Sequence, residues 1–213
     1  MYTQVMNLFL DTANTDCWAD LAGTRLFSGI TTNPLLIQRA GLKTSIKTYQ
    51  ALYERAIELG YPSIQFQVFG EDWLQCAQSI AAIGPEVLIK IPANTAGFEV
   101  VSELGLPDRT TLTAVYSDGQ VIAAEALQVA YTAPYYARLK ETIDNADALF
   151  DRMQDIAFET ELLVASLRSN EQFLDLAARC FSTFALPEPI ARTFFESTLA
   201  DKAIADFEEA ARS

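Results

Sequence analysis

The sequence predicts an α/β protein in which residues 1–213 form a single (β/α)₈ barrel domain, a TIM barrel. Eight apolar, β-rich runs alternate with amphipathic stretches along the chain, which is the order of elements in this fold. No Gly/Ser-rich linker or internal repeat divides the chain, and its length suits one domain with short loops. A doubly wound open sheet is the alternative, but the early glycines lack the G-x-G-x-x-G pattern typical of that fold.

The strand candidates are rich in β-branched and aromatic residues, and they occupy residues 8–13, 26–32, 63–69, 86–92, 110–117, 130–138, 161–167 and 180–186. Helix candidates lie between them, at residues 43–59, 71–82, 118–128, 140–157, 169–178 and 188–197. Asn33-Pro34 predicts a helix start, and residues 117–120 have the spacing of a capping box. The last segment, residues 198–212, places Leu199, Ile204 and Phe207 on one side of an amphipathic C-terminal helix.

Composition argues against several classes of function. The net charge is −13, with 15 basic and 28 acidic residues, so neither nucleic acid nor an anionic membrane is expected as a partner. No apolar run approaches the roughly 20 residues that span a bilayer, and the first residues lack the features of a secretory signal, so a cytosolic location is expected. Cys17, Cys76 and Cys180 form no disulfide framework or metal pattern and are interpreted as small buried residues.

The sequence contains no histidine. This excludes Ser-His and Cys-His nucleophile pairs, histidine-liganded zinc, and histidine as a general acid or base. Proton transfer at an active site would therefore have to use Asp, Glu, Lys, Tyr or water.

Active sites of (β/α)₈ barrels lie at the carboxyl ends of the strands, so polar residues near those ends are the candidate site residues. They are Asp11, Thr31, Asn33, Gln67, Lys90, Thr113, Tyr131, Arg138, Ser166 and Arg168. Because each of these residues lies within or just after a different predicted strand, or pairs with a neighbour there, we expect their side chains to converge on one pocket.

Lys90 is the most unusual candidate, because it lies in a strand between Ile89 and Ile91. Both faces of a barrel strand are covered, so an ammonium group there loses much of its hydration. In one interpretation the lysine is a buried cation paired with a carboxylate. In the other, desolvation lowers the pKa of the amine, which then attacks a carbonyl group and forms a Schiff base.

Asp11 and Asn33 also have two interpretations each. Both are suited to cap a helix, while Asp11 could exchange protons with a substrate and Asn33, with Thr31, could bind sugar hydroxyl groups. The pair Arg138 and Arg168 could form surface salt bridges, or could bind a phosphate group near strands six and seven.

Gln67, Thr113 and Tyr131 form a further group. Together they could hold a water molecule that carries protons, which a site without histidine would need. Taken singly, Thr113 suits a strand and Tyr131 suits a core.

Six stretches resemble, in order, the landmark motifs of the transaldolase family, and most closely its small members, which include fructose 6-phosphate aldolases. They are LFLDTAN, GITTNPLLI, VLIKIPANTAG, TAVYSDGQ, YTAPYYAR and VASLR. The resemblance extends from about Leu8 to Pro187. Its TTNP motif and the lysine of KIP are specific when they occur together in this order.

The resemblance implies a class I aldolase that uses neither a metal nor an organic cofactor and acts on a phosphorylated sugar. Lys90 would form the Schiff base, and Asp11 would handle the proton of the C4 hydroxyl group. The residues implied to bind substrate are Thr31, Asn33 and Ser166 for the three-carbon unit, and Arg138 and Arg168 for the phosphate. The family also implies a ring-based homo-oligomer, often a decamer, in which the C-terminal helix packs on a neighbour.

The subtype depends on few residues. Transaldolases carry glutamate in place of Gln67 and typically phenylalanine in place of Tyr131. Gln67, Thr113 and Tyr131 match fructose 6-phosphate aldolases, which cleave or form fructose 6-phosphate through a dihydroxyacetone unit on the lysine. The alternatives are a true transaldolase, which moves dihydroxyacetone from fructose 6-phosphate to erythrose 4-phosphate, and a non-catalytic sugar-phosphate-binding barrel. Residues 139–150 and 167–168 depart from the aldolase pattern.

Overall fold

The computed structural model describes residues 5–212, which contain a closed barrel of parallel strands. Neighbouring strands pair in sequence order, and the last pairs with the first to close the barrel. They are β1 (Asn7–Asp11), β2 (Gly29–Thr31), β3 (Ile64–Gln67), β4 (Val87–Pro92), β5 (Thr110–Val115), β6 (Tyr131–Pro134), β7 (Glu161–Val164) and β8 (Thr183–Leu186). Because all strands run in the same direction, their carboxyl ends meet at one mouth. The predicted (β/α)₈ barrel is confirmed.

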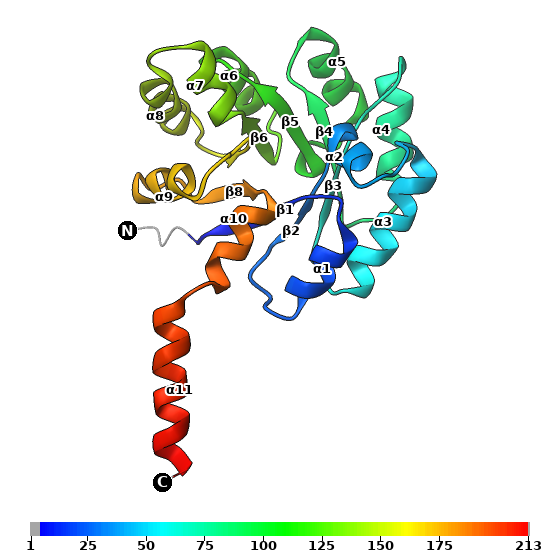
Figure 1. Cartoon of the computed structure of the whole chain (residues 1–213). Coiled ribbons are helices and arrows are strands. Elements are labelled where there is room, and N and C mark those ends of the chain that lie inside the picture. The colour runs from blue at the N-terminus through cyan, green and yellow to red at the C-terminus, as the bar shows by residue number, and fades with distance from the viewer. Residues whose placement is uncertain (1–4, 213) are drawn as a thin grey trace.

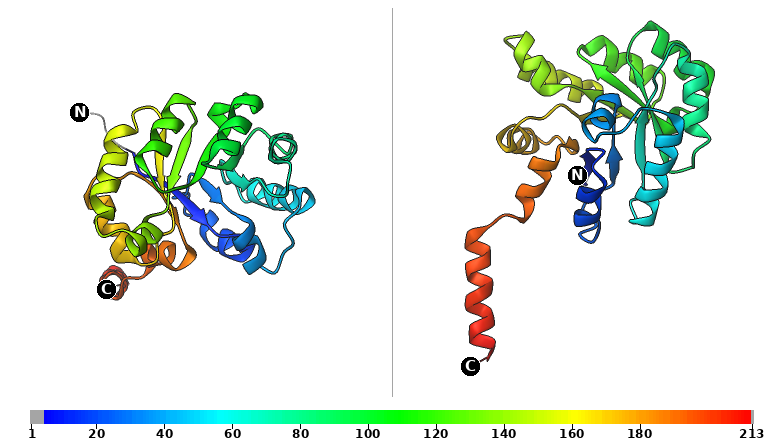
Figure 2. Two further views of the ribbon diagram at one scale, coloured as in Figure 1. Left: turned by 90° about the horizontal axis from the view of Figure 1, so that it is seen from above. Right: turned by 45° about the vertical axis from the view of Figure 1, so that its right-hand side comes forward.

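Helices connect the strands and surround the barrel (Figure 1 and Figure 2). They are α1 (Thr15–Ala22), α2 (Pro34–Arg39), α3 (Ile46–Glu58), α4 (Trp73–Ala81), α5 (Thr95–Leu104), α6 (Asp118–Ala126), α7 (Tyr136–Thr142), α8 (Ala146–Ile156), α9 (Asn170–Ala178), α10 (Glu188–Arg192) and α11 (Thr198–Arg212). The predicted C-terminal helix is α11, which extends away from the barrel (Figure 1). Within residues 5–212, no helix has both the length and the apolar composition that crossing a membrane requires.

Both predicted helix starts are confirmed. Asn33 Oδ1 accepts hydrogen bonds from the first free N–H groups of α2, and Pro34 is the first residue of that helix. Ser117 caps α6 by accepting a hydrogen bond from the N–H of Gln120, and the Gln120 side chain accepts one from the N–H of Tyr116. These caps satisfy N–H groups that would otherwise lack partners.

The region after β6 differs from the prediction. The strand predicted at residues 130–138 ends at Pro134, because the aromatic run that follows it turns into α7. The helix predicted at residues 140–157 is divided into α7 and α8, because Ile143 is extended, with φ −137° and ψ 138°. Helices α1 and α5 follow β1 and β4, where the barrel implied a helix but no helix range was predicted, and α10 is shorter than the predicted range 188–197.

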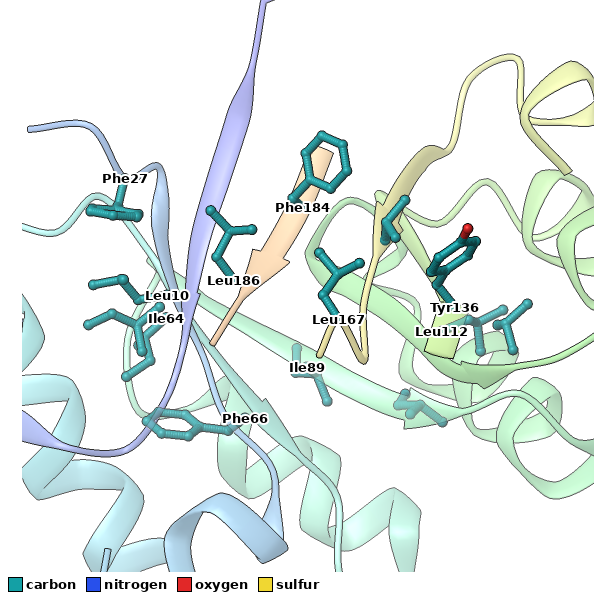
Figure 3. Packing of buried hydrophobic residues seen from close by; sticks show 14 of the residues in the cluster. Leu10, Phe27, Ile64, Phe66, Ile89, Leu112, Tyr136, Leu167, Phe184 and Leu186 are labelled. Carbon is teal, nitrogen blue, oxygen red and sulfur yellow. The ribbon is translucent and has the colours of Figure 1, made fainter. Parts of the chain in front are cut away.

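Hydrophobic side chains pack in two layers. The larger layer lies between the strands and the helices and includes Leu10, Ile64 and Ile89, which Figure 3 shows with their neighbours. The smaller layer consists of Phe9, Ala133, Leu163, Ala165 and Ala185, with Tyr131 and Tyr135 packed against it. Successive residues of a strand face opposite sides, so this smaller layer fills the interior of the barrel.

Helix α5 begins very close to the end of β4. A Cβ atom at Gly97 would lie 1.9 Å from the carbonyl oxygen of Pro92, the last residue of β4. Asn94 Oδ1 accepts a hydrogen bond of 2.9 Å from the N–H of Gly97, which holds the first turn of α5 at this distance. A side chain at residue 97 would therefore push the helix away from the strand that carries Lys90.

We expect Gly97→Ala to destabilise the fold by roughly 1–3 kcal/mol, because the added methyl group overpacks this contact. Gly119→Ala is the matched control, since Gly119 lies in the first turn of α6 and its Cβ would meet only Ser117 Oγ, at 3.9 Å. The control should be neutral or up to about 1 kcal/mol more stable, because alanine favours helices. Urea unfolding measures both variants, and equal stabilities would contradict the close packing.

Candidate active site

A pocket of about 520 Å³ opens at the carboxyl ends of the strands. Most of the predicted site residues line it, namely Asp11, Asn33, Gln67, Lys90, Arg138, Ser166 and Arg168. The other lining residues are Pro34, Leu35, Leu36, Arg39, Ala114, Tyr135, Ala165, Leu167 and Pro187. The barrel thus brings together side chains from Asp11 to Arg168, which are 157 residues apart in the sequence, as the predicted convergence requires.

Lys90 lies within β4 and points into the barrel, with only 4% of its surface exposed. Its Nζ donates a hydrogen bond of 2.7 Å to Thr31 Oγ1 on β2. Burial lowers the pKa of Lys90, and the negative charge of Asp11 acts in the opposite direction without cancelling the effect of burial. The amine is therefore more readily deprotonated than an exposed lysine, which favours its use as a nucleophile.

Asp11 is the last residue of β1 and is the register partner of Thr31 on β2. Burial raises the pKa of Asp11, while the positive charges of Lys90 and Arg39 act against this rise. Because both groups lose hydration, the site favours a neutral amine and a carboxyl group that can take up a proton near it. No ion pair joins Lys90 to a carboxylate among the described residues, in contrast to the buried-pair interpretation of this lysine.

Thr31 and Asn33 occupy different levels of the site. Thr31 is fully buried, and its hydroxyl oxygen contacts the lysine rather than open space. Asn33 caps α2 and also lines the pocket, so the structural and the functional interpretations of this residue are compatible. The cap holds the Asn33 side chain at the edge of the pocket.

Thr113 meets a tyrosine, but a different one from the tyrosine predicted. Its hydroxyl group lies 3.0 Å from the phenol oxygen of Tyr135, and either oxygen can be the donor. Tyr135 follows β6 and lines the pocket together with Gln67. Burial raises the pKa of Tyr135, so its phenol keeps its proton and can donate it in a hydrogen bond.

Tyr131 does not join this group, which corrects the sequence-based prediction. It is the first residue of β6 and so lies at the amino end of the strand, away from the mouth. Its ring packs edge-on against Phe9, with centroids 5.6 Å apart, and burial raises the pKa of its phenol to about 12. The prediction was wrong because the strand is shorter than the range 130–138, which moves its carboxyl end to the residues beside Tyr135.

The two candidate phosphate-binding arginines differ in whether a carboxylate already neutralises their charge. Arg168 donates two hydrogen bonds to the carboxylate of Glu141, so its charge is already balanced. The guanidinium group of Arg138 lies over the Tyr135 ring, 4.9 Å from its centroid, and donates a hydrogen bond of 3.3 Å to the Tyr116 hydroxyl. Among the described residues Arg138 has no carboxylate partner, which leaves its charge available to an anion.

Two features of the pocket were not predicted from the sequence. Arg39, the last residue of α2, lines the pocket and acts on the charge of Asp11. An arginine at the end of a helix is common, so nothing near Arg39 in the sequence indicates that it reaches the pocket. Ala114 and Ser166 also line the pocket with φ of 57° and 62°, values that residues other than glycine seldom adopt. Ala114 coincides with the register shift between Thr113 and Val115, which re-aims the end of β5.

The arrangement can perform covalent chemistry on a carbonyl compound. It supplies a poorly hydrated amine, a carboxyl group with a raised pKa, a hydroxyl–phenol pair and an unpaired guanidinium group around one pocket. Within residues 5–212, no cluster of three or more His, Cys, Asp or Glu side chains is placed to hold a metal ion.

Comparison with known proteins gives a family match over almost the whole chain. The profile of the family described as Transaldolase/Fructose-6-phosphate aldolase matches residues 8–212. A protein of Alkaliphilus metalliredigens named Probable transaldolase is 30% identical over 211 residues, covering 95% of this chain and 96% of its own. A protein of Coprothermobacter proteolyticus with the same name is 27% identical, covering 95% of this chain and 94% of its own.

Solved structures with low sequence identity share the fold. An HpcH/HpaI aldolase from Desulfitobacterium hafniense superimposes with a TM-score of 0.62 at 11% identity, covering 97% of this chain and 94% of its own. Dihydrodipicolinate synthase from Rhodopseudomonas palustris gives a TM-score of 0.58 at 13% identity, covering 88% of this chain and 71% of its own. These likenesses extend to the barrel architecture alone.

We expect Lys90→Met to be more stable than the native chain by roughly 1–3 kcal/mol near neutral pH, because an apolar side chain of similar length avoids the loss of hydration. The folded-state pKa of Lys90 is lowered, so the native chain should gain stability as the pH rises from that pKa towards the unfolded value of about 10.4. The advantage of the variant should therefore shrink with pH. Urea unfolding at pH 7 and pH 9 tests this.

Lys47→Met provides the control for this prediction, since Lys47 is exposed on α3 and its stability effect should stay within about 0.5 kcal/mol at both pH values. A Lys90→Met variant that is less stable than the native chain at pH 7, or whose advantage grows at pH 9, would contradict the assignment of a dehydrated lysine.

Proposed function

Because the chain belongs to the Transaldolase/Fructose-6-phosphate aldolase family, whose enzymes act on sugar phosphates, we propose that it is a class I aldolase that cleaves or forms fructose 6-phosphate through a Schiff base on Lys90. The observation that carries the proposal is the buried Lys90 amine, with its lowered pKa, at a pocket that also contains Asp11. A buried lysine that is kept without an ion-pair partner is expected where the amine itself reacts.

The proposed reaction begins at the carbonyl carbon of the sugar. Neutral Lys90 Nζ attacks C2 of fructose 6-phosphate, and loss of water from the carbinolamine gives an iminium ion. Asp11 then takes the proton of the C4 hydroxyl group as the C3–C4 bond breaks. The electrons of that bond form an enamine on Lys90, and glyceraldehyde 3-phosphate leaves.

The fate of the enamine separates the aldolase from the transaldolase. In an aldolase the enamine is protonated at C3, and water then hydrolyses the iminium ion and releases dihydroxyacetone. Gln67, Thr113 and Tyr135 would hold this water, with Tyr135 taking the role that the sequence suggested for Tyr131. The phenol of Tyr135 supports the aldolase, because it supplies a proton donor in a protein without histidine.

Arg138 would bind the phosphate group of the sugar, and Ser166 would bind a hydroxyl group of the three-carbon unit. Both line the pocket, and the Arg138 guanidinium has no carboxylate partner among the described residues. Arg168 contributes less in this proposal, because both of its terminal nitrogens already donate hydrogen bonds to Glu141.

A true transaldolase is the second candidate, since the curated relatives with 30% and 27% identity carry that name. In this case the enamine would survive until erythrose 4-phosphate enters and accepts the three-carbon unit. The same lysine and carboxylate serve both reactions, so only the fate of the enamine distinguishes them.

Borohydride reduction in the presence of dihydroxyacetone should attach the three-carbon unit covalently to Lys90, and Lys90→Met should give no adduct. Peptide mass spectrometry locates the adduct. An adduct on another lysine would eliminate the proposed mechanism. Fructose 6-phosphate supplied alone should yield glyceraldehyde 3-phosphate if the protein is an aldolase, whereas production that requires erythrose 4-phosphate identifies a transaldolase.

Tyr135→Phe should retain borohydride trapping but release dihydroxyacetone about tenfold or more slowly, because the phenol proton next to the water is lost. Transfer to an added acceptor aldehyde should suffer less than release. Tyr131→Phe is the control. It removes the equivalent phenol oxygen from a tyrosine at the amino end of β6, and it should leave both rates close to the native values. Similar losses in the two variants would argue against a role for Tyr135 at the site.

A homo-oligomer is the proposed assembly, and α11 is the proposed contact. This helix projects from the barrel (Figure 1), and its side chains Leu199, Ile204 and Phe207 are 81%, 57% and 71% exposed. Three large apolar side chains on one side of a projecting helix suggest a surface that a second copy covers.

The expected cytosolic location stays a prediction.

Replacing both Leu199 and Phe207 with serine should lower the molar mass measured by light scattering after size-exclusion chromatography. Ile122→Ser is the control, since Ile122 on α6 is 56% exposed but lies on the barrel. A native chain that elutes as a monomer would refute the proposed assembly, and an unchanged mass of the double variant would refute the role of α11.

A further inference from the structure

A polar pair lies deep in the barrel, below the pocket. Gln65 on β3 and Thr111 on β5 are both fully buried. Gln65 is two residues before Gln67, which lines the pocket, so its side chain points to the same interior face of the strand. Alanine, leucine and phenylalanine side chains fill the neighbouring interior, where barrels usually carry apolar residues. A glutamine at this depth therefore calls for a physical reason.

The hydrogen bonds of Gln65 are incomplete. Thr111 Oγ1 donates a hydrogen bond of 3.0 Å to Gln65 Oε1, while Gln65 Nε2 is buried without a partner among the described residues. If the amide is turned over, Nε2 donates to Thr111 and Oε1 is left instead. In either orientation one polar atom of the amide has no protein partner, which lowers stability unless another group satisfies that atom.

The pair lies next to the hydrogen bond between Lys90 and Thr31. Gln65 is the register partner of Thr31, and Thr111 is the register partner of Lys90. Thr31 Oγ1 accepts its hydrogen bond from Lys90 Nζ, and among the described residues this is the one hydrogen bond of the Thr31 hydroxyl. Among the described residues, the hydroxyl hydrogen of Thr31 and the free amide atom of Gln65 therefore both have no hydrogen-bond partner, and they lie at neighbouring positions in the barrel.

We propose that Gln65 is a positioning residue for the Schiff base on Lys90, because its amide binds a water molecule enclosed below the lysine, between Gln65 and the hydroxyl group of Thr31. In this chain of hydrogen bonds, Nζ donates to Thr31, Thr31 donates to the water, and the water donates to Gln65 Oε1. The amide takes the turned-over orientation, in which Nε2 donates to Thr111 and Oε1 is free to accept. Each donor points away from Nζ, so the chain stabilises positive charge on that nitrogen. This inference rests on the proposed function, in which Nζ becomes the nitrogen of a cationic iminium ion.

The chemical need for such a group follows from the burial of Lys90. Burial favours the neutral amine that attacks, but it disfavours the iminium ion that forms on the same nitrogen. Asp11 on β1 is the titratable group whose charge acts on Lys90, and it is influenced in turn by Arg39 on α2. Tyr135, after β6, is the other titratable neighbour of Asp11. Gln65 does not titrate, so its contribution would persist across the pH range.

Gln65→Met replaces the amide with an apolar side chain of similar length. If the proposal holds, the ammonium form of Lys90 loses solvation, and its titration midpoint should fall by about half a pH unit or more, as followed by the ¹³Cε signal of Lys90. The value of kcat with fructose 6-phosphate should fall about tenfold, with KM little changed, because the loss acts on the cationic intermediate.

Two further variants separate this role from a general effect on packing. Gln65→Ser leaves room for water in place of the amide and should restore the midpoint towards the native value. Thr132→Val removes another fully buried hydroxyl group without a partner among the described residues, on the face of β6 opposite Ala133 and the barrel interior. Whatever its effect on stability, this control should leave the midpoint and kcat unchanged.

The titration needs no substrate, so it tests Gln65 independently of the proposed reaction. Equal midpoints in the native chain and in Gln65→Met would overturn the inference, as would a shift of equal size in Thr132→Val. A shifted midpoint confined to Gln65→Met supports it. Absence of a borohydride adduct on native Lys90 would instead refute the proposed function.

Discussion

The loss of water around the amine of Lys90 is the constraint on which the site depends. A closed parallel barrel covers both faces of β4, so the lysine has no route to open solvent except through the mouth. The resulting penalty on the charged form lowers the pKa of Lys90, and burial raises the pKa of Asp11 for the same reason. The shifted pKa values of the pair therefore come from the architecture, and no ion pair at Lys90 is needed to explain them.

This constraint also explains the polar side chains of the interior. Thr31 contacts Nζ, and the Gln65–Thr111 pair lies beside both of them, at positions that would otherwise be filled by apolar residues. Polar groups at these depths reduce stability, and the large apolar layer between strands and helices offsets the loss. The left-handed backbone at Ala114 and Ser166 adds strain at the pocket wall, which is where functional sites commonly hold it.

The absence of histidine gives the remaining proton carriers more importance. Asp11 stands next to the lysine, while the Thr113–Tyr135 pair stands on the other side of the pocket, on β5 and after β6. Arg138 packs on the Tyr135 ring, so the residue that would bind phosphate also holds the phenol in place. In the proposed function, this contact would link phosphate binding at Arg138 to the water held by Tyr135 near Lys90.

The sequence by itself determined the barrel and singled out Lys90 as an unusual buried residue, because alternation of strands and helices and a lysine within an apolar run are local signals. It also placed Asp11 and Asn33 correctly at strand ends, since each follows a well-marked apolar stretch. The tertiary structure decided what depends on the length of an element or on contacts across the barrel. A strand that ends at Pro134 brings Tyr135 to the pocket and leaves Tyr131 at the opposite end, and no composition rule fixes that boundary.

Contacts between distant segments were equally hidden from the sequence. Glu141 neutralises Arg168, and Arg39 reaches the pocket from the end of α2, although nothing near either residue in the sequence indicates it. The unpaired amide of Gln65 became visible only once its neighbours in the barrel were known. Period and composition report which face of an element is buried, whereas the partner of each buried polar atom depends on the register and closure of the whole sheet.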